Sequence, residues 1–228
     1  MKISINQPAF LPWMNYFKRI SEVDIFVLLD DVQYEKNSFI NRNKIKDQNK
    51  NEDLWLTIPL KKSKLNSQDN IIKNISISSD KVWKRKQLKT IIQNLSKHKN
   101  FSLIKNNIDK IYYCDDKNLL NFLVNQLKII TKMLKINTKI VQSSDLQIKE
   151  KKSQKIFEIC KKLNADEYIS GPEGKNYLDK SLFNNQIKVT YFNNHEINQN
   201  FDKELIKYSI IQSFSFYGDK IVNYFQEK

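Results

Sequence analysis

The chain has 228 residues, of which 40% are hydrophobic and 11% aromatic, and this composition predicts a folded protein and argues against disorder. No apolar run approaches the roughly 20 residues of a membrane-spanning helix, and the N-terminus lacks the apolar segment of a signal peptide, so a cytoplasmic protein is expected. The net charge of +14 favours anionic partners such as nucleotides or RNA, although abundant Lys and Asn with only 3 Gly also suit an AT-rich coding sequence.

The first third of the chain alternates between strand-like and polar segments. Apolar runs of strand length occur at 3–5, 24–29, 54–60 and 74–78. A short helix is predicted over 13–20, and polar loops over 30–46 and 61–70. A strand, a helix and a second strand in this order are most simply a parallel βαβ unit.

Helices dominate the middle of the chain, and alternation returns after it. Helices are predicted over 83–95, 101–113, 118–134, 152–163 and 203–216, with a helical turn over 176–183. Strands are predicted over 138–141, 167–170 and 188–192. We therefore expect an α/β fold with a mostly parallel sheet and flanking helices. Residues 1–228 are expected to form one domain, with a helical segment inserted at about 80–135.

The cysteines and histidines do not indicate a metal site. Cys114 and Cys160 lie far apart in helix-like segments, which favours reduced thiols. His98 and His195 have no metal-binding spacing. We expect neither a metal nor a cofactor.

The connection after the first strand is the first candidate part of a ligand site. It contains Gln7, Trp13 and Tyr16, and two prolines lie between Gln7 and Trp13. Aromatic rings can stack on a base or sugar, and Gln7 can hydrogen-bond to polar edges. The alternative is a stiff loop filled by a buried Trp.

Two adjacent carboxylates follow the second strand. Asp30 and Asp31 are candidate catalytic residues, because side chains at the carboxyl end of a buried strand commonly face a ligand in α/β proteins. Neighbours on an extended chain point to opposite faces, so one Asp is expected to act on the ligand while the other caps the turn. Gln33 and Tyr34 are candidate binding residues beside them.

The triplet Asn41, Arg42 and Asn43 is a third candidate group. The guanidinium fork suits phosphate or carboxylate, and each Asn can donate and accept hydrogen bonds. Arginine occurs only at positions 19, 42 and 85 of this lysine-rich chain, which makes Arg42 a better phosphate-binding candidate than the lysines nearby.

A glycine-containing loop after the strand over 167–170 is the fourth group. Ser170 and Gly171 begin it, and Lys175 and Tyr177 follow. A strand, a glycine loop and a helical turn can bind an anion through backbone N–H groups, although the spacing is not that of a Walker loop. Ser144, after an earlier strand, is expected at the same edge of the sheet and can contribute a hydroxyl or a helix cap.

Several of these segments together resemble the WbqC-like family of bacterial proteins. The similar segments are QPAFLPWMNYF, DIFVLLDDVQYEKNSFINRNKIK, WLTIPL, YISGPEGKNYL and YSIIQSFSFYG, in this order along most of the chain. Asn15 stands where the family usually has Gly, and Phe39 where it often has Trp. The resemblance implies a role among the proteins of O-antigen and other surface-polysaccharide biosynthesis.

The activity that this resemblance implies is modification of a nucleotide-linked amino sugar by acyl or aminoacyl transfer. The reaction then requires an acyl or aminoacyl donor, and an aminoacyl-tRNA can fill that role. No Ser/His/Asp or Cys/His triad is evident, so direct transfer is preferred to a covalent intermediate. The alternatives are a nucleotidyl-transfer enzyme and a sugar-nucleotide-binding accessory protein without catalysis. The sequence leaves the oligomeric state open.

Overall fold

The computed structural model describes residues 1–47, 50–61, 70–183, 186–193 and 195–226. A five-stranded, fully parallel sheet lies at its centre, and it confirms the α/β prediction. The strands are β1 (Lys2–Asn6), β2 (Ile25–Leu28), β5 (Lys139–Gln142), β6 (Glu167–Ser170) and β7 (Lys188–Tyr191).

The strand order in the sheet is β5-β2-β1-β6-β7. The chain builds the sheet outward from β1 to β2 and β5, and then returns to the other side of β1 to add β6 and β7. The direction of winding therefore reverses between β1 and β6, which pair through Ile3 and Tyr168. Ligands of such doubly wound sheets bind at the carboxyl ends of the strands at this switch point.

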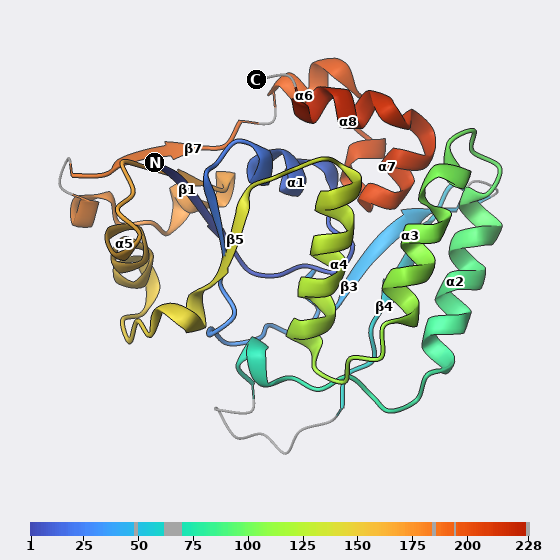
Figure 1. Cartoon of the computed structure of the whole chain (residues 1–228), viewed down its shortest axis with the longest axis horizontal. Helices are drawn as coiled ribbons and strands as arrows, with labels where there is room; N and C mark the ends of the chain where they lie inside the picture. The colour runs from blue at the N-terminus through green and yellow to red at the C-terminus, as the bar shows by residue number, and fades with distance from the viewer. Residues whose placement is uncertain (48–49, 62–69, 184–185, 194, 227–228) are drawn as a thin grey trace.

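Helices cover both faces of the sheet because the strands are apolar on both sides. In β2, Phe26 and Leu28 pack into the core that contains α1 (Met14–Ser21), whereas Ile25 and Val27 pack into the core that contains α5 (Lys152–Lys162). This explains the nearly continuous apolar run of β2. Figure 1 shows α5 and the middle helices on different sides of the strands.

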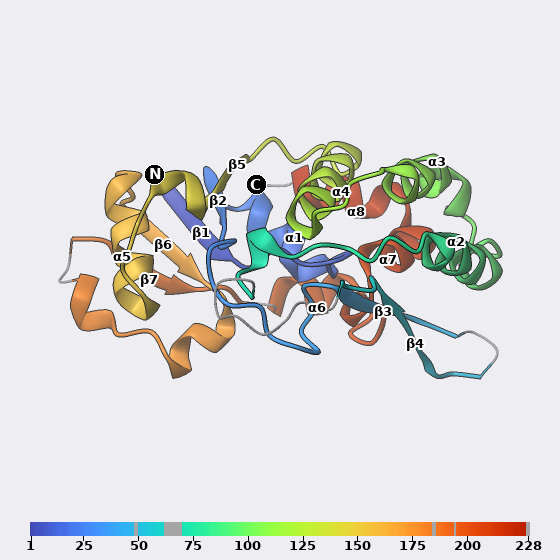
Figure 2. The ribbon, with the colours of Figure 1, turned by 90° about the horizontal axis from the view of Figure 1, so that it is seen from below.

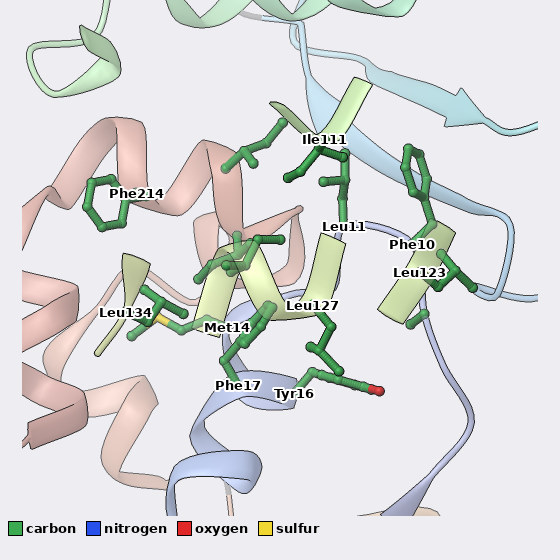
Figure 3. Close-up of a cluster of buried hydrophobic side chains, with 14 of the residues drawn as sticks. Phe10, Leu11, Met14, Tyr16, Phe17, Ile111, Leu123, Leu127, Leu134 and Phe214 are labelled. Carbon is green, nitrogen blue, oxygen red and sulfur yellow. The ribbon is translucent and has the colours of Figure 1, made fainter. Parts of the chain in front are cut away.

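The expected helical segment lies between the fourth and fifth strands of the chain. Its helices are α2 (Val82–Leu95), α3 (Phe101–Tyr113) and α4 (Leu119–Met133). Asn118 begins α4 by accepting a hydrogen bond from the backbone N–H of Asn121 at 3.0 Å. The apolar side of α4 joins the core, and Figure 3 shows Leu123 and Leu127 close to side chains of the β1–α1 connection.

The prediction of an unbroken loop over 30–46 is wrong at its end. Residues Arg42–Lys46 form β3, which pairs antiparallel with β4 (Asp53–Thr57) in a separate hairpin. Its buried face carries Asn43 and Ile45, so alternation is present but polar residues conceal it. Figure 2 shows this hairpin extending away from the five-stranded sheet.

The predicted strand over 74–78 is also wrong. The structure has a short 3-10 helix, η1 (Ile72–Asn74), followed by isolated bridges from Ser76 and Ile77 to different partners. The polar segment predicted as a loop over 61–70 falls largely outside the described residues.

The C-terminal region contains more breaks than the single helix predicted over 203–216. Its helices are α6 (His195–Asn200), the short 3-10 helix η5 (Leu205–Lys207), α7 (Ile210–Tyr217) and α8 (Asp219–Gln226). The backbone N–H of Ser209 donates to the backbone oxygen of Lys44 in the hairpin at 3.0 Å, and that of Ile210 donates to the backbone oxygen of Pro12 in the β1–α1 connection at 2.8 Å. This segment therefore binds these two parts of the chain instead of continuing a helix. Gly218 then ends α7 with a φ of 55°.

Two further 3-10 helices matter below: η2 (Ser143–Leu146), which follows β5, and η3 (Pro172–Asn176), which follows β6. A fifth, η4 (Lys180–Phe183), lies where a helical turn was predicted. Of the helices in the described part of the chain, none combines the length and the apolar character needed to cross a membrane.

Candidate functional site

A cavity of about 330 Å³ lies at the carboxyl edge of the sheet, where β1 and β6 run side by side. We call it the switch-point cavity. The end of β1, helix α1 and the loop and 3-10 helix after β6 form its walls. Four of the predicted site residues line it: Trp13, Tyr16, Gly171 and Tyr177.

Helix α1 presents three cavity residues at intervals of three positions. Trp13 stands at the N-terminus of the helix, and Tyr16 and Arg19 follow on the same face. The Tyr16 hydroxyl donates to the backbone oxygen of Gln7 at 3.1 Å, which fixes the ring against the β1–α1 connection. Burial raises the pKa of Tyr16 well above its usual range, so the phenol stays protonated. The Gln7 side chain does not line the cavity.

Arg19 is the residue that sequence reasoning missed. Its side chain is 6% exposed, it lines the cavity, and its Nε has no hydrogen-bond partner. Burial lowers the pKa of this guanidinium, and the hydroxyls of Tyr168 and Tyr16 oppose that effect only in part. No carboxylate of the described residues pairs with it. A buried cation without an acidic partner is costly, and an anionic ligand would remove that cost.

The two glycines of the loop after β6 allow neighbouring side chains to pack closely against its backbone. A β-carbon at Gly171 would clash with Nη1 of Arg19, so glycine lets the guanidinium lie directly against the loop backbone. A β-carbon at Gly174 would clash with the hydroxyl of Ser170. The φ of Gly171 is −62°, so close approach and not an unusual conformation explains this glycine.

Two other polar groups face the switch-point cavity. The Oδ1 of Asn15 is a buried acceptor without a hydrogen-bond partner, and it matches N–H or O–H donors of a ligand. Glu173 supplies an exposed carboxylate that accepts from Asn176 at 3.1 Å. The cavity therefore contains an unused donor, an unused acceptor and a carboxylate.

The two candidate catalytic aspartates form a different group at the same edge of the sheet. Asp30 is fully buried and accepts from the Ser143 hydroxyl at 2.9 Å and from the Ser144 N–H and hydroxyl at 2.9 and 2.6 Å. Asp31 accepts from Lys155 at 2.7 Å, and its Oδ1 lies 2.5 Å from the same Ser143 hydroxyl, whose single proton the two carboxylates share. We call these five residues the aspartate network. Neither carboxylate lines the switch-point cavity.

The aspartate network joins the ends of two neighbouring strands. Asp30 follows β2 and the serines of η2 follow β5, so the hydrogen bonds of Asp30 tie these two strand ends together. All three donors to Asp30 come from the protein, which gives this residue a structural role. The ion pair of Asp31 with Lys155 adds helix α5 to the same contact.

The amides of the predicted 41–43 triplet support the backbone. The Asn41 amide donates to the backbone oxygen of Ile58 at 2.9 Å and accepts from the Tyr34 hydroxyl at 2.8 Å. The Asn43 amide donates to the backbone oxygen of Leu11 at 2.7 Å. These bonds attach the β3–β4 hairpin to the loops around it.

Three other predicted residues lie away from the switch-point cavity. Arg42 lies over the ring of Trp55 in the hairpin, with 4.4 Å from Cζ to the ring centroid. Lys175 is exposed and lies 5.5 Å from the ring centroid of Tyr191. The side chain of Gln33 is exposed in the loop after β2. The structure thus divides the predicted residues among the cavity, the aspartate network and the hairpin, and does not gather them in one cleft.

Comparison with known proteins shows a family and one relative. The model of the WbqC-like protein family matches residues 7–224. A protein of Mycobacterium tuberculosis (strain ATCC 25618 / H37Rv), named Uncharacterized protein Rv1507c, is 30% identical over 193 residues, which cover 84% of this chain and 81% of the relative. No solved structure matches the chain.

Proposed function

The chain belongs to the WbqC-like protein family, and from that premise we propose that it is a transferase acting on a nucleotide-linked amino sugar. The reaction that we infer attaches an acyl or aminoacyl group, such as a glycyl group, to the sugar amine. Its setting is the biosynthesis of a bacterial surface polysaccharide of the O-antigen type. The observation that carries the proposal is the buried Arg19 of the switch-point cavity, which has no acidic partner in the described part of the chain.

The diphosphate of a nucleotide-linked sugar suits the environment of Arg19. A guanidinium presents several N–H donors in one plane, and phosphate oxygens accept them in pairs. The glycine loop lies against this guanidinium, so its backbone can approach the same phosphates. The position at the switch point of a doubly wound sheet also favours a nucleotide ligand.

The amino-sugar part of the substrate suits the other polar groups of the cavity. The unpaired Oδ1 of Asn15 can accept a hydrogen bond from a sugar hydroxyl or amine. Trp13 and Tyr177 offer ring surface for the apolar face of a sugar. Glu173 is the carboxylate of the cavity wall and suits the role of proton acceptor.

The proposed step is a direct acyl transfer. The sugar nitrogen attacks the carbonyl carbon of the activated donor, a C–N bond forms, and the bond from that carbon to the leaving group breaks. Glu173 receives the proton that the nitrogen loses. A thiol intermediate is disfavoured, because burial raises the pKa of Cys160 to about 12 and also raises the pKa of Cys114.

The second candidate is an accessory protein that binds the sugar nucleotide without catalysis. The aspartate network favours it, because both candidate catalytic carboxylates are already engaged by donors of the protein. In this case Arg19 and the glycine loop would still bind the diphosphate.

Binding and catalysis can be tested with the same substrates. Purified protein is titrated with UDP-, dTDP- and GDP-linked amino sugars by calorimetry, and mixtures with acyl thioesters or aminoacyl-tRNA are analysed by mass spectrometry. We expect one sugar nucleotide to gain the mass of the acyl group. The variant Arg19→Gln should bind that ligand at least about tenfold more weakly, whereas the exposed control Arg85→Gln on α2 should bind it normally.

The outcomes separate the candidates. Binding that depends on Arg19 without any mass increase supports the accessory protein. Unchanged binding by Arg19→Gln contradicts both candidates, because neither then explains the buried guanidinium.

A further inference from the structure

A continuous aromatic surface leads from the switch-point cavity onto the β3–β4 hairpin. The ring centroids of Trp13 and Phe39 lie 5.2 Å apart, and those of Phe39 and Trp55 lie 6.1 Å apart. Phe39 is 41% exposed and Trp55 is 46% exposed. Exposed apolar side chains that form a contiguous patch commonly mark an interaction site.

The protein holds these rings in place. The backbone oxygen of Phe39 accepts from the N–H of Phe10 at 3.0 Å, which fixes the loop to the β1–α1 connection. Trp55 lies on the outward face of β4, because its neighbour Leu56 points into the core with 1% exposure. The aromatic surface is therefore built into the fold.

Positive charge accompanies the rings. The guanidinium of Arg42 lies over Trp55, and its Nε has no hydrogen-bond partner. Lys44 lies 5.9 Å from the same ring, but its charge is paired with Asp53 at 2.6 Å. Arg42 is thus a hairpin cation that forms no ion pair with a carboxylate of the described residues.

A cavity of about 400 Å³ adjoins the aromatic surface, and Trp13, Phe39 and the segment 203–207 line it. Its one carboxylate among the lining residues, Glu204, is paired with Lys207 at 2.6 Å, whereas Lys203 has no carboxylate partner in the described ranges. Trp13 and Asn15 line both this cavity and the switch-point cavity, so the two cavities are adjacent.

We propose that this aromatic surface, formed by Trp13, Phe39 and Trp55 with Arg42 and Lys203 beside them, binds an unpaired strand of RNA. Bases of a single strand expose their faces and stack on protein rings, while Arg and Lys contact the phosphates between them. A duplex keeps its base faces covered. A neutral glycan could cover the rings, but it would leave the two unbalanced cations without a counter-charge.

Because the two cavities are adjacent, bound RNA can take part in the transfer reaction. This role of the RNA rests on the proposed function. An RNA whose 3′ end carries an aminoacyl ester would place that ester at the mouth of the switch-point cavity. The sugar amine attacks the ester carbonyl carbon, the C–N bond forms, and the C–O bond to the ribose breaks. The proton lost by the nitrogen passes through Glu173 to the ribose oxygen, which leaves as a free hydroxyl.

The test measures RNA binding directly. Fluorescence anisotropy is followed with a labelled single strand of about 12 nucleotides, with the same sequence as a duplex, and with AMP as competitor. We expect the single strand to bind more tightly than the duplex, with an affinity that falls as salt rises. Trp55→Ala and Phe39→Ala should each weaken it about tenfold.

Matched controls use residues outside the aromatic surface. Tyr113 on α3 is an aromatic residue with 77% exposure, and Arg85 on α2 is an exposed arginine. Tyr113→Ala and Arg85→Ala should leave the affinity unchanged, while Arg42→Ala should weaken it and reduce the salt dependence. Circular dichroism checks that each variant folds.

Three results would overturn the inference: equal affinity for strand and duplex, equal losses in the control variants, or competition by AMP at the affinity of the RNA. The last result would indicate a mononucleotide site. Arg19→Gln separates this inference from the proposed function, because it should weaken sugar-nucleotide binding at least about tenfold while RNA binding persists.

Discussion

Two groups of buried charge lie at the carboxyl edge of one sheet and differ in how their charge is balanced. In the aspartate network, Lys155 pairs with Asp31 at 2.7 Å, and Asp30 accepts three hydrogen bonds from protein donors. In the switch-point cavity, Arg19 is equally buried, but the described residues provide no carboxylate for it. Position in the sheet alone would make both groups candidates for catalysis.

The difference separates structural charge from charge reserved for a ligand. Charges that are already paired inside the protein stabilise the contact between β2, β5 and α5, and changing them should damage the fold. An unpaired buried cation destabilises the empty protein and gains its partner only on binding. Stability measurements can therefore test the comparison without knowledge of the substrate.

The largest effect is expected for Asp30→Ala. The substitution leaves the backbone N–H and the hydroxyl of Ser144 without their buried acceptor, and it should lower the free energy of unfolding by about 3–5 kcal/mol. Urea denaturation measures this change. The control Asp145→Ala, an exposed carboxylate of the same 3-10 helix, should stay within about 0.5 kcal/mol. A loss below about 1 kcal/mol for Asp30→Ala would contradict a structural role.

A double-mutant cycle tests the ion pair of the network. Lys155→Met leaves the Asp31 carboxylate buried with one hydroxyl donor, and should cost about 2–4 kcal/mol. Adding Asp31→Asn removes the unpaired charge, so the double variant should lose less than the sum of the two single variants. If the losses of stability in the two single variants, measured from their urea midpoints, add up to the loss in the double variant, Asp31 and Lys155 have no interaction energy.

In the protein without ligand, Arg19→Met should change the free energy of unfolding in the opposite direction. Because no carboxylate is left behind, the variant should be as stable as the original protein or more stable by about 1 kcal/mol. Lys18→Met is the matched control: this neighbouring buried cation has Glu22 as a partner at 3.7 Å, so its loss should destabilise the protein. If both variants lower the thermal stability by the same amount, the proposed difference between the unpaired Arg19 and the paired Lys18 is wrong.

Much of the sheet was predictable because its signals are local. The apolar runs of β1, β2 and β6 and the helical stripe of α4 determine their own conformation, and the structure confirms them. The position of a site at the strand ends followed from the βαβ order alone. The β3–β4 hairpin was missed because one buried side chain of β3 is Asn43, whose amide nitrogen donates to the backbone oxygen of Leu11, far away in the sequence.

The balance of charge was not predictable, because it depends on contacts between distant segments. Nothing local shows that Asp31 meets Lys155, or that Arg19 meets no carboxylate. One signal was present: Trp13, Tyr16 and Arg19 are spaced three residues apart in a predicted helix, which places the arginine on the face of two candidate residues. The rarity of arginine directed attention to Arg42, which the structure places in the hairpin.

A half-buried histidine supplies the smallest effect and a contrast with Arg19. The ring of His98 packs against that of Phe216 with 3.9 Å between centroids and a tilt of 38°, and its buried Nε2 has no hydrogen-bond partner. Burial lowers the pKa of His98, so the folded protein binds the proton less readily than the unfolded chain. Stability contributed by this site is therefore present above the unfolded pKa of about 6.5 and is lost as the pH falls toward the folded pKa.

The measurement is the free energy of unfolding of the original protein and of His98→Asn between pH 7.5 and pH 5. The original protein should lose more stability on acidification than the variant, by less than the effects predicted above, because solvent reaches part of the ring. Parallel pH profiles would contradict the lowered pKa. Histidine escapes the cost of burial by releasing its proton, whereas the guanidinium of Arg19 cannot, and this is why an unpaired buried arginine indicates a missing anion.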